Sequence, residues 1–417
     1  MKLRGSGTSV AKSKVFRCPV HGYISVTDDY CSRFIDTLVF QRLRGIQQTS
    51  MRVLFPSAHH DRFCHSLGVF HLGKRAVESL IENSTEEESR RILERSQPSF
   101  LIACLLHDCA HAPFSHLLEG YCDAGHTLNG VLKNLMNDKS FTDDYDQRDK
   151  EPAPHEKASA VIVLKEFRDA IVKCNGDPKL ICRMILGCKH RQSPGHKELL
   201  QNCLIELLNS TTIDVDKLDY ILRDTWASGV NNISIDIERL LSSLTIVRDN
   251  DGVPRLAFNK SALSVVQNVV EARNYLYRWV YGHHKVVYFH ELLRRATEAL
   301  AECLSPANSQ AFLSEFFSVD RLLTPKTVEG VSIFLPSDGD ITYLLKRFFQ
   351  DIPEARELLS QKAKHPLWKS YGEYKLIFEN ISDQQQMEIM SQAEAKLPQF
   401  WSHRKNASPV DIWVLEP

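Results

Sequence analysis

The residues with the clearest capacity for chemistry lie in the segment 100–116, which reads FLIACLLHDCAHAPFSH. An apolar run ends there in His107 and Asp108, and His111 and His116 follow directly. A histidine and an aspartate that emerge from a buried helix are costly to desolvate unless a bound metal ion supplies compensating charge. On a continuing helix His111 shares the face of His107, one turn later. The His-Asp pair alone is weak evidence, because such dipeptides are common by chance.

Two further segments strengthen the case for a metal site. Residues 57–68 read SAHHDRFCHSLG and place His65 close to a cation, and residues 211–224 read TTIDVDKLDYILRD and contain Asp216. Two imidazoles and two carboxylates suit iron, manganese, zinc or another first-row metal better than calcium. The sequence therefore predicts a divalent transition-metal site, with magnesium as a further candidate ion. The candidate ligands in these three segments are His65, His107, Asp108 and Asp216.

The third of these segments also predicts a face that binds substrate. Asp216, Tyr220 and Asp224 follow one another at intervals of four residues, so a helix presents all three on the same side. Asp219 and Arg223 lie beside them and are expected to be structural partners. One helical face would thus offer a metal ligand, an aromatic ring and a carboxylate together.

The elements that must position these residues are mainly helical. From Tyr30 to Leu300 apolar residues recur at three- and four-residue spacing, which is typical of amphipathic helices. Short alternating stretches flank the turn signal Asp-Asn-Asp-Gly at 249–252 and predict a hairpin. We therefore predict a mainly α fold, with a helical catalytic core in residues 1–310. A smaller mixed α/β lobe, serving assembly or regulation, is predicted for residues 311–417.

Composition excludes several classes of protein. The chain has 417 residues, 43% hydrophobic and 25% charged, which is the range of globular proteins. Its 51 basic and 52 acidic residues argue against a globally basic nucleic-acid binder, although a local basic groove stays possible. No apolar stretch is long enough for a membrane span, and the 11 cysteines form no CxxC pair. We expect an intracellular protein, cytoplasmic or nuclear, with reduced thiols.

The sequence resembles the HD domain of the SAM-and-HD-domain deoxynucleoside triphosphate triphosphohydrolases and of their bacterial dNTPase relatives. Seven segments in the same order carry the resemblance, and they are far more specific than the His-Asp pair alone. They read KVFRCPVHGYI, IDTLVFQRLRGIQQ, FPSAHHDRFCHSLGV, LLHDCAHAPFSH, HEKAS, IDVDKLDYILRD and ARNYLYRWVYGHHK. The resemblance implies an HD-domain core that hydrolyses dNTPs to deoxynucleoside and triphosphate.

The resemblance also implies roles for individual residues. It assigns the metal to the four ligands named above, and places further histidines and one glutamate around the α-phosphate. The implied catalytic residues are His111, His116, His155 and Glu119. The implied substrate-binding residues are Gln48, Arg62, Lys217, Tyr220, Asp224, Arg273 and Tyr281. Arg62, Lys217 and Arg273 would bind phosphate. The two tyrosines would pack on the sugar and exclude a ribose 2′-hydroxyl, Asp224 would bind the 3′-hydroxyl, and Gln48 would also contact the sugar.

Plainer interpretations exist for each residue taken alone. Arg62 could form a structural salt bridge, His155 could be a helix-start residue, and both tyrosines could be core aromatics. After Gln48 the family commonly has Leu-Gly, but this chain has Thr49-Ser50-Met51. That departure keeps open a phosphodiesterase or nuclease acting on another nucleotide or on single-stranded nucleic acid. A nucleotide-sensing module with a vestigial metal site is the third alternative, although every ligand position is filled.

The resemblance finally implies control by a guanine nucleotide. GTP or dGTP would bind as activator, in a homo-oligomer that is a dimer or a tetramer. The implied allosteric residues are Lys14, Val15, Asp36, Gln41, Arg44, Arg239 and Lys260. The second part of this site is less complete, because Phe258 stands where another arginine is expected. The alternative is that Asp36 and Arg44 only stabilise a helix through neighbouring charges.

Overall fold

The computed structural model describes residues 12–230, 234–328 and 330–361, together with Ser382, Gln384, Gln385 and Glu388. Two compact units divide the chain, Met1–Ala363 and Lys364–Pro417, and the first contains every candidate site residue. Of the lobe predicted for residues 311–417, the part from residue 362 onward lies outside the described residues, apart from the four residues named above. The predicted division near residue 310 stays a prediction.

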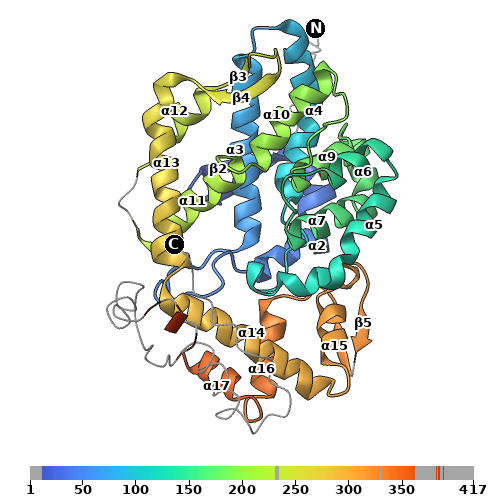
Figure 1. The fold of residues 1–417 in the computed structure, drawn as a ribbon, viewed down its shortest axis with the longest axis vertical. Helices are drawn as coiled ribbons and strands as arrows, with labels where there is room; N and C mark the ends of the chain where they lie inside the picture. The colour runs from blue at the N-terminus through green and yellow to red at the C-terminus, as the bar shows by residue number, and fades with distance from the viewer. Residues whose placement is uncertain are drawn as a thin grey trace, which may run out of the picture. The chain divides into compact units, whose positions relative to one another are not determined.

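The first unit is mainly α-helical, as the sequence predicted (Figure 1). Its helices are α1 (Asp28–Tyr30), α2 (Leu38–Gln41), α3 (Arg62–Glu82), α4 (Glu87–Leu106), α5 (Thr127–Met136), α6 (Lys139–Asp146), α7 (Pro154–Lys165), α8 (Arg168–Lys173), α9 (Pro178–Leu186), α10 (His196–Leu208), α11 (Val215–Ser228), α12 (Ile237–Ser242), α13 (Leu263–Leu276), α14 (His284–Leu304), α15 (Ser309–Phe316), α16 (Asp338–Arg347) and α17 (Pro353–Ser360). Short 3-10 or π-helical turns are η1 (Cys31–Ile35), η2 (Arg42–Gly45), η3 (Ser115–Leu117), η4 (Glu119–His126), η5 (Lys260–Ala262), η6 (Tyr277–Tyr281) and η7 (Val319–Leu322). Among the described residues no helix combines the length and apolar character needed to cross a bilayer.

The described strands form three antiparallel hairpins. They pair β1 (Ser13–Cys18) with β2 (Gly22–Thr27), β3 (Leu244–Arg248) with β4 (Pro254–Phe258), and β5 (Lys326–Val328) with β6 (Val331–Ile333). The hairpin predicted around residues 249–252 is confirmed. Gly252 has a φ of 76° there, and the Asp249 carboxylate accepts hydrogen bonds from the backbone of Asp251 and Val253. A residue without a Cβ adopts that left-handed turn at no steric cost.

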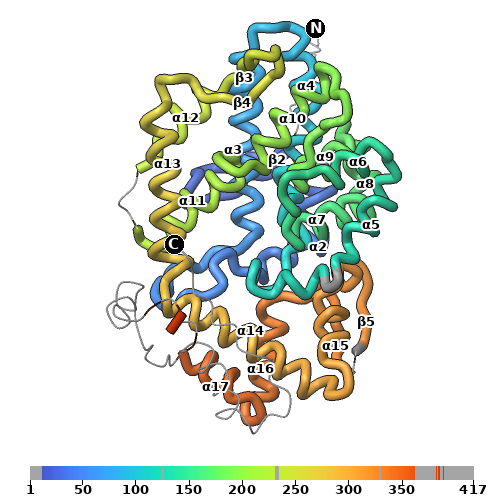
Figure 2. The backbone as a smooth tube through the Cα atoms, in the orientation of Figure 1, coloured from blue at the N-terminus to red at the C-terminus, as the bar shows by residue number. Residues whose placement is uncertain are grey.

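Helix α3 runs through the centre of the unit and packs against α4 and α11 (Figure 2). Asp61 begins it, because its side chain accepts a hydrogen bond from the backbone N–H of Cys64 over 2.8 Å. Two glycines inside α3 allow its neighbours to approach closely. A Cβ on Gly73 would lie 2.6 Å from Cys104 Sγ of α4, and one on Gly68 would lie 1.8 Å from Asp219 Oδ1 of α11. The central helices therefore contact one another at distances that a larger residue would forbid.

A second hydrophobic cluster is built around α14 and the helices that follow it. It buries Phe289 and Leu293 of α14 with Ile341 of α16. Met51 and Ala112 also belong to this cluster, although both precede α14 by far in the sequence. The loops on either side of the predicted active site are therefore packed against the C-terminal part of the described chain.

Candidate metal centre and active site

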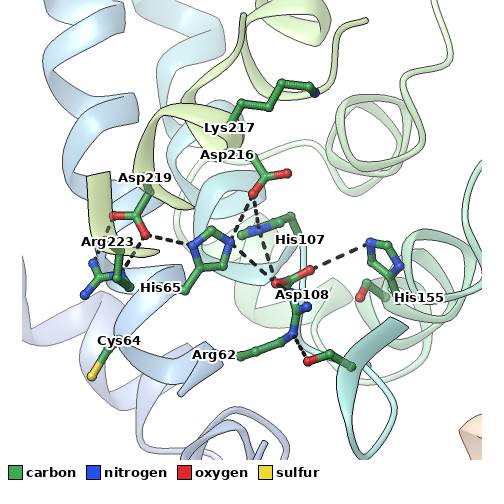
Figure 3. A network of polar contacts seen from close by, with 12 residues as sticks. Arg62, Cys64, His65, His107, Asp108, His155, Asp216, Lys217, Asp219 and Arg223 are labelled. Atoms are coloured by element: carbon green, nitrogen blue, oxygen red, sulfur yellow. Dashed lines mark hydrogen bonds and ion pairs between the residues drawn. The ribbon is translucent and has the colours of Figure 1, made fainter. Parts of the chain in front are cut away.

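Three separate elements bring the four predicted metal ligands together (Figure 3). His65 lies in the first turn of α3, His107 and Asp108 follow the end of α4, and Asp216 lies in the first turn of α11. His65 Nε2 is 3.0 Å from Asp216 Oδ1 and 3.7 Å from Asp108 Oδ2. His107 Nε2 is 3.5 Å from Asp108 Oδ2 and 3.7 Å from Asp216 Oδ1. Two imidazole nitrogens and two carboxylate oxygens thus face a common point.

The chemistry of these atoms fits a bound cation. His65 Nε2 and His107 Nε2 are buried and make no hydrogen bond with suitable geometry in the described part of the chain. Buried nitrogens are rarely left unsatisfied, so an unseen partner is expected. One ligand atom each from His65, His107 and Asp108 lies within 4.8 Å of the others. The set of nitrogen and oxygen donors suits a first-row transition metal.

A hydrogen-bond network behind His65 fixes the orientation of its ring. His65 Nδ1 donates to Asp219 Oδ2 over 2.7 Å, which leaves Nε2 directed at the cluster. Arg223 Nε and His21 Nε2 donate to the same aspartate, over 2.8 and 2.5 Å. On the other ligand, His107 Nδ1 donates to the carbonyl of Cys104 over 3.0 Å. Such partners select the ring nitrogen that faces a metal and orient the imidazole.

Sequence reasoning identified Asp219 and Arg223 as structural partners but gave no role to His21 or Gly68. His21 stands in the segment KVFRCPVHGYI, which carried part of the resemblance. A glycine within an otherwise regular helix was the available signal for Gly68. Neither signal predicts the contact with Asp219, because the β1–β2 hairpin, α3 and α11 are distant from one another in sequence.

Electrostatics keep the two carboxylates ionised. Burial opposes the charge on Asp108, but the guanidinium of Arg62 and the neighbouring His107 outweigh it and hold the pKa of Asp108 well below its usual range. Burial also opposes ionisation of Asp216, yet the imidazole of His65, 3.0 Å away, and the nearby His107 lower its pKa to about 2. Both aspartates are therefore in the form that binds a cation near neutral pH.

The predicted catalytic residues form a second cluster beside the first. The rings of His111 and His155 stack with centroids 4.3 Å apart, and the ring of His116 packs edge-on against both. Glu119 accepts from His155 Nδ1 over 2.5 Å and from His116 Nδ1 over 3.2 Å. His155 Nε2 lies 3.9 Å from Asp108 Oδ1, so the two clusters meet at that carboxylate. All four predicted residues are brought together, as Figure 3 shows for His155.

One premise of the sequence argument is wrong. Helix α4 ends at Leu106, and His111 does not share a helical face with His107. The chain turns instead, with the N–H of Cys109 bonded to the Leu106 carbonyl and the N–H of His111 to the Asp108 carbonyl. Ala110 and Cys109 pack against Ser159 of α7, whose hydroxyl accepts from the N–H of Ala110. Packing on α7, rather than helical spacing, places His111 beside His155.

The two stacked imidazoles, those of His111 and His155, have pKa values shifted in opposite directions. Burial and the nearby cation Arg62 lower the pKa of His111 well below its usual range, so its ring is neutral. Burial also acts to lower the pKa of His155, but the charge and hydrogen bond of Glu119 outweigh it and raise that pKa to about 9. Burial opposes ionisation of Glu119 as well, yet His155 and His116 hold its pKa well below the usual range. A neutral and a protonated imidazole therefore lie side by side.

The two cations predicted to bind phosphate differ in position. Arg62 is buried at the junction of the clusters, where it bonds Asp108, donates from Nε to Ser115 Oγ over 2.8 Å and lies 3.4 Å from His116 Nε2. Lys217 instead donates to Asp214 Oδ2 over 2.6 Å and to the carbonyl of Ser210. The described Lys217 ammonium is therefore directed to the start of α11 rather than to the metal cluster (Figure 3).

The residues predicted to contact the sugar gather around Asp224. One of its carboxylate oxygens accepts from His60 Nε2 over 2.6 Å, and the other accepts from the hydroxyl of Tyr281. Arg273 Nε lies 3.4 Å from the hydroxyl oxygen of Tyr220. His60 was missed by sequence reasoning, although it stands in the segment that contains Arg62 and His65.

Gln48 joins this group through the chain backbone. Its N–H donates to the carbonyl of His60 over 3.0 Å, while its buried Oε1 has no hydrogen-bond partner among the described residues. Met51, the last residue of the segment Thr49-Ser50-Met51 that departs from the family pattern, is buried in the second hydrophobic cluster. The free Gln48 oxygen is an acceptor available to a ligand.

The predicted allosteric residues fall into two groups. Lys14 Nζ donates to Asp36 Oδ2 over 2.6 Å, Gln41 donates to the carbonyl of Ile35, and Arg44 Nε donates to Gln41 Oε1 over 2.9 Å. Val15 is exposed between them on β1. Arg239 donates to the carbonyl of Ser261, next to the exposed Lys260. Each group is assembled within this chain.

Comparison with curated proteins confirms the resemblance. A Dictyostelium discoideum protein named deoxynucleoside triphosphate triphosphohydrolase SAMHD1 homolog is 28% identical over 334 residues, which is 78% of this chain and 54% of that protein. The Bos taurus deoxynucleoside triphosphate triphosphohydrolase SAMHD1 is 30% identical over 281 residues, 65% of this chain and 44% of its own. The uncharacterized Bacillus subtilis protein YwfO is 30% identical over 303 residues, 72% of this chain and 57% of its own.

The chain spans about half the length of these relatives. No protein-family model matches it. The similarity therefore covers most of this chain but only part of each relative.

Proposed function

We propose that this chain, a homologue over most of its length of proteins named deoxynucleoside triphosphate triphosphohydrolase, hydrolyses dNTPs to deoxynucleoside and triphosphate. One observation carries the proposal: the buried Nε2 atoms of His65 and His107 lack hydrogen-bond partners among the described residues, and both face the carboxylates of Asp108 and Asp216. The proposed ligands are His65, His107, Asp108 and Asp216. Bound there, a divalent ion such as iron, manganese or zinc supplies Lewis acidity toward a phosphoryl oxygen and lowers the pKa of water.

The histidine cluster is proposed to move protons at the α-phosphate. Glu119 holds the Nδ1 atoms of His155 and His116, which leaves the Nε2 atom of His155 for substrate, whereas His116 Nε2 lies 3.4 Å from the Arg62 guanidinium. Protonated His155 is suited to give a proton to the departing 5′-oxygen, and neutral His111 is suited to accept one. Arg62 lies where a guanidinium can stabilise the charge that develops on phosphate oxygens.

The sugar is proposed to bind between Tyr220, Tyr281 and Asp224. Because the Tyr281 hydroxyl donates its proton to Asp224, its oxygen can only accept from a ligand. The side-chain oxygens of Asp224 are proposed to accept from the 3′-hydroxyl, and Gln48 offers a further acceptor. The tyrosine rings are proposed to leave no room for a 2′-hydroxyl. Equal turnover of dGTP and GTP would contradict this part of the proposal.

The decisive experiment combines metal analysis with product identification for each dNTP and NTP. Wild-type protein is expected to carry about one divalent metal ion per chain and to release triphosphate from dNTPs. His107→Ala and Asp108→Ala should lower bound metal and abolish hydrolysis, whereas His126→Asn, which changes an exposed histidine, should retain both. Release of a nucleoside monophosphate, or cleavage of single-stranded nucleic acid without triphosphate, would replace the proposal by the phosphodiesterase alternative.

A further inference from the structure

The loop that carries the proposed catalytic histidines has an unfavourable backbone conformation. Phe114 and Ser115 are consecutive non-glycine residues, and both have a φ of 56° in the left-handed region. Each such residue costs about 1 kcal/mol or more and persists only where neighbouring structure enforces it. The positions of His111 and His116, on either side, therefore depend on contacts made by this loop.

A carboxylate from a remote part of the chain makes two of these contacts. Asp338, the first residue of α16, is buried, and its Oδ1 accepts from the N–H of Phe114 over 2.6 Å. Its Oδ2 accepts from the N–H of Gln47 over 2.9 Å. One side chain thus joins the histidine loop to the backbone that leads into Gln48.

Other contacts close the same junction. Ser115 Oγ donates to the carbonyl of Gln47 over 2.6 Å, and Ser50 Oγ donates to the carbonyl of Phe114 over 2.7 Å. Buried Arg42 donates from Nε to the carbonyl of Pro336 over 2.8 Å and from its terminal nitrogen to the carbonyl of His111. The start of α16 is therefore linked to Phe114 through Asp338, and the preceding Pro336 is linked to His111 through Arg42.

We propose that Asp338 is a positioning residue for catalysis. It fixes the position of the loop that carries His111 and His116 relative to the backbone at Gln47 and Gln48. The inference rests on the proposed function, because Asp338 itself reaches no reacting atom. Two acceptor oxygens are required, since two separate N–H groups must be satisfied. An asparagine of the same shape keeps one acceptor and turns an NH2 group toward the other N–H.

The test compares Asp338→Asn with Asp340→Asn. Asp340 accepts from the N–H and hydroxyl of Ser337 and so stabilises the start of the same helix without a bond to the histidine loop. Asp338→Asn should lower kcat for dNTP hydrolysis by about 10- to 100-fold while bound metal stays at the wild-type level. Asp340→Asn should keep kcat within about twofold even if the melting temperature falls, since its bonds serve only the helix. Asp338→Glu retains both acceptors and should keep more activity than Asp338→Asn.

Hydrogen exchange at the amides of Phe114 and Gln47 gives a readout that needs no activity. Both amides should exchange faster in Asp338→Asn and not in Asp340→Asn. Wild-type kcat and exchange in a folded Asp338→Asn variant would overturn the inference, as would equal loss of kcat in both variants. If Asp338→Asn does not fold, Asp338→Glu decides: because it keeps both acceptors, the amides of Phe114 and Gln47 should stay protected, and faster exchange at both amides with wild-type kcat would overturn the inference. If the wild type releases no triphosphate, the proposed function fails, and the exchange result still shows whether Asp338 holds the loop.

Discussion

Asp219 accepts a hydrogen bond from Nδ1 of His65 over 2.7 Å, and this bond directs His65 Nε2 toward His107, Asp108 and Asp216. Asp219 is itself held by Arg223 and His21, and all of these side chains are buried. A carboxylate with three donors cannot be replaced by an amide without leaving a donor unsatisfied. The orientation of one proposed metal ligand therefore depends on a residue that does not touch the metal.

Asp219→Asn is expected to lower metal affinity about 10- to 100-fold, the range typical of lost outer-shell partners. The measurement is bound metal by elemental analysis after dialysis against graded chelator concentrations. Asp236→Asn serves as a control, because the Asp236 carboxylate accepts from the backbone N–H of Arg239 at the start of α12. Metal retention equal to wild type at every chelator concentration would show that Asp219 does not orient the site.

Gly68→Ala tests the close contact between α3, which contains Gly68, and Asp219 of α11. An added Cβ would lie 1.8 Å from Asp219 Oδ1 and 2.4 Å from an Arg223 nitrogen, so a buried ion pair must move. We expect the free energy of unfolding to fall by about 3 kcal/mol or more, with loss of bound metal. Gly130→Ala in α5 is the matched control, since its Cβ would meet no described atom within 4 Å. That change should be neutral or stabilise by up to about 1 kcal/mol; similar unfolding curves for the two variants would contradict the prediction.

Control by guanine nucleotide is tested at Asp36, which pairs with Lys14 in the structure. GTP should raise the initial rate of dATP or dTTP hydrolysis in the wild type, and Asp36→Ala should abolish the stimulation while keeping its metal. By linkage, substrate should tighten GTP binding by the same factor by which GTP tightens substrate binding. Light scattering measures whether mass increases with GTP. Unchanged rate and mass in the wild type would mean that the Lys14–Asp36 pair only stabilises the fold and that the enzyme is constitutive.

Stability should depend on pH through His290 of α14. Burial lowers the pKa of His290 from 6.5 to about 4, so the folded state favours the neutral ring. The unfolded chain takes up the proton first, and the contribution of His290 to stability is present above pH 6.5 and is lost as the pH falls toward 4. The loss is on the order of 3 kcal/mol. Denaturant unfolding from pH 7 to 4 should show a shallower decline for His290→Gln than for the wild type; parallel declines would exclude this effect.

The sequence by itself determined the fold class, the hairpin around residues 249–252 and the identity of the residues that gather in the site. Periodicity predicts a helix because burial selects one face, and the Asp-Asn-Asp-Gly turn is encoded locally. The order of His65, His107, Asp108 and Asp216 indicated a metal site. The structure brings these four side chains together, and their roles as ligands stay predictions.

Tertiary structure alone decided how those residues are held. Helix α4 ends at Leu106, so packing of the next residues on α7, and not helical spacing, places His111 against His155. The contacts of Asp219 with His21 and of Asp338 with Phe114 join segments separated by 198 and 224 residues. No local pattern specifies such partners, because a side-chain hydrogen bond depends on the relative placement of whole helices, and that placement is set by packing of the complete core.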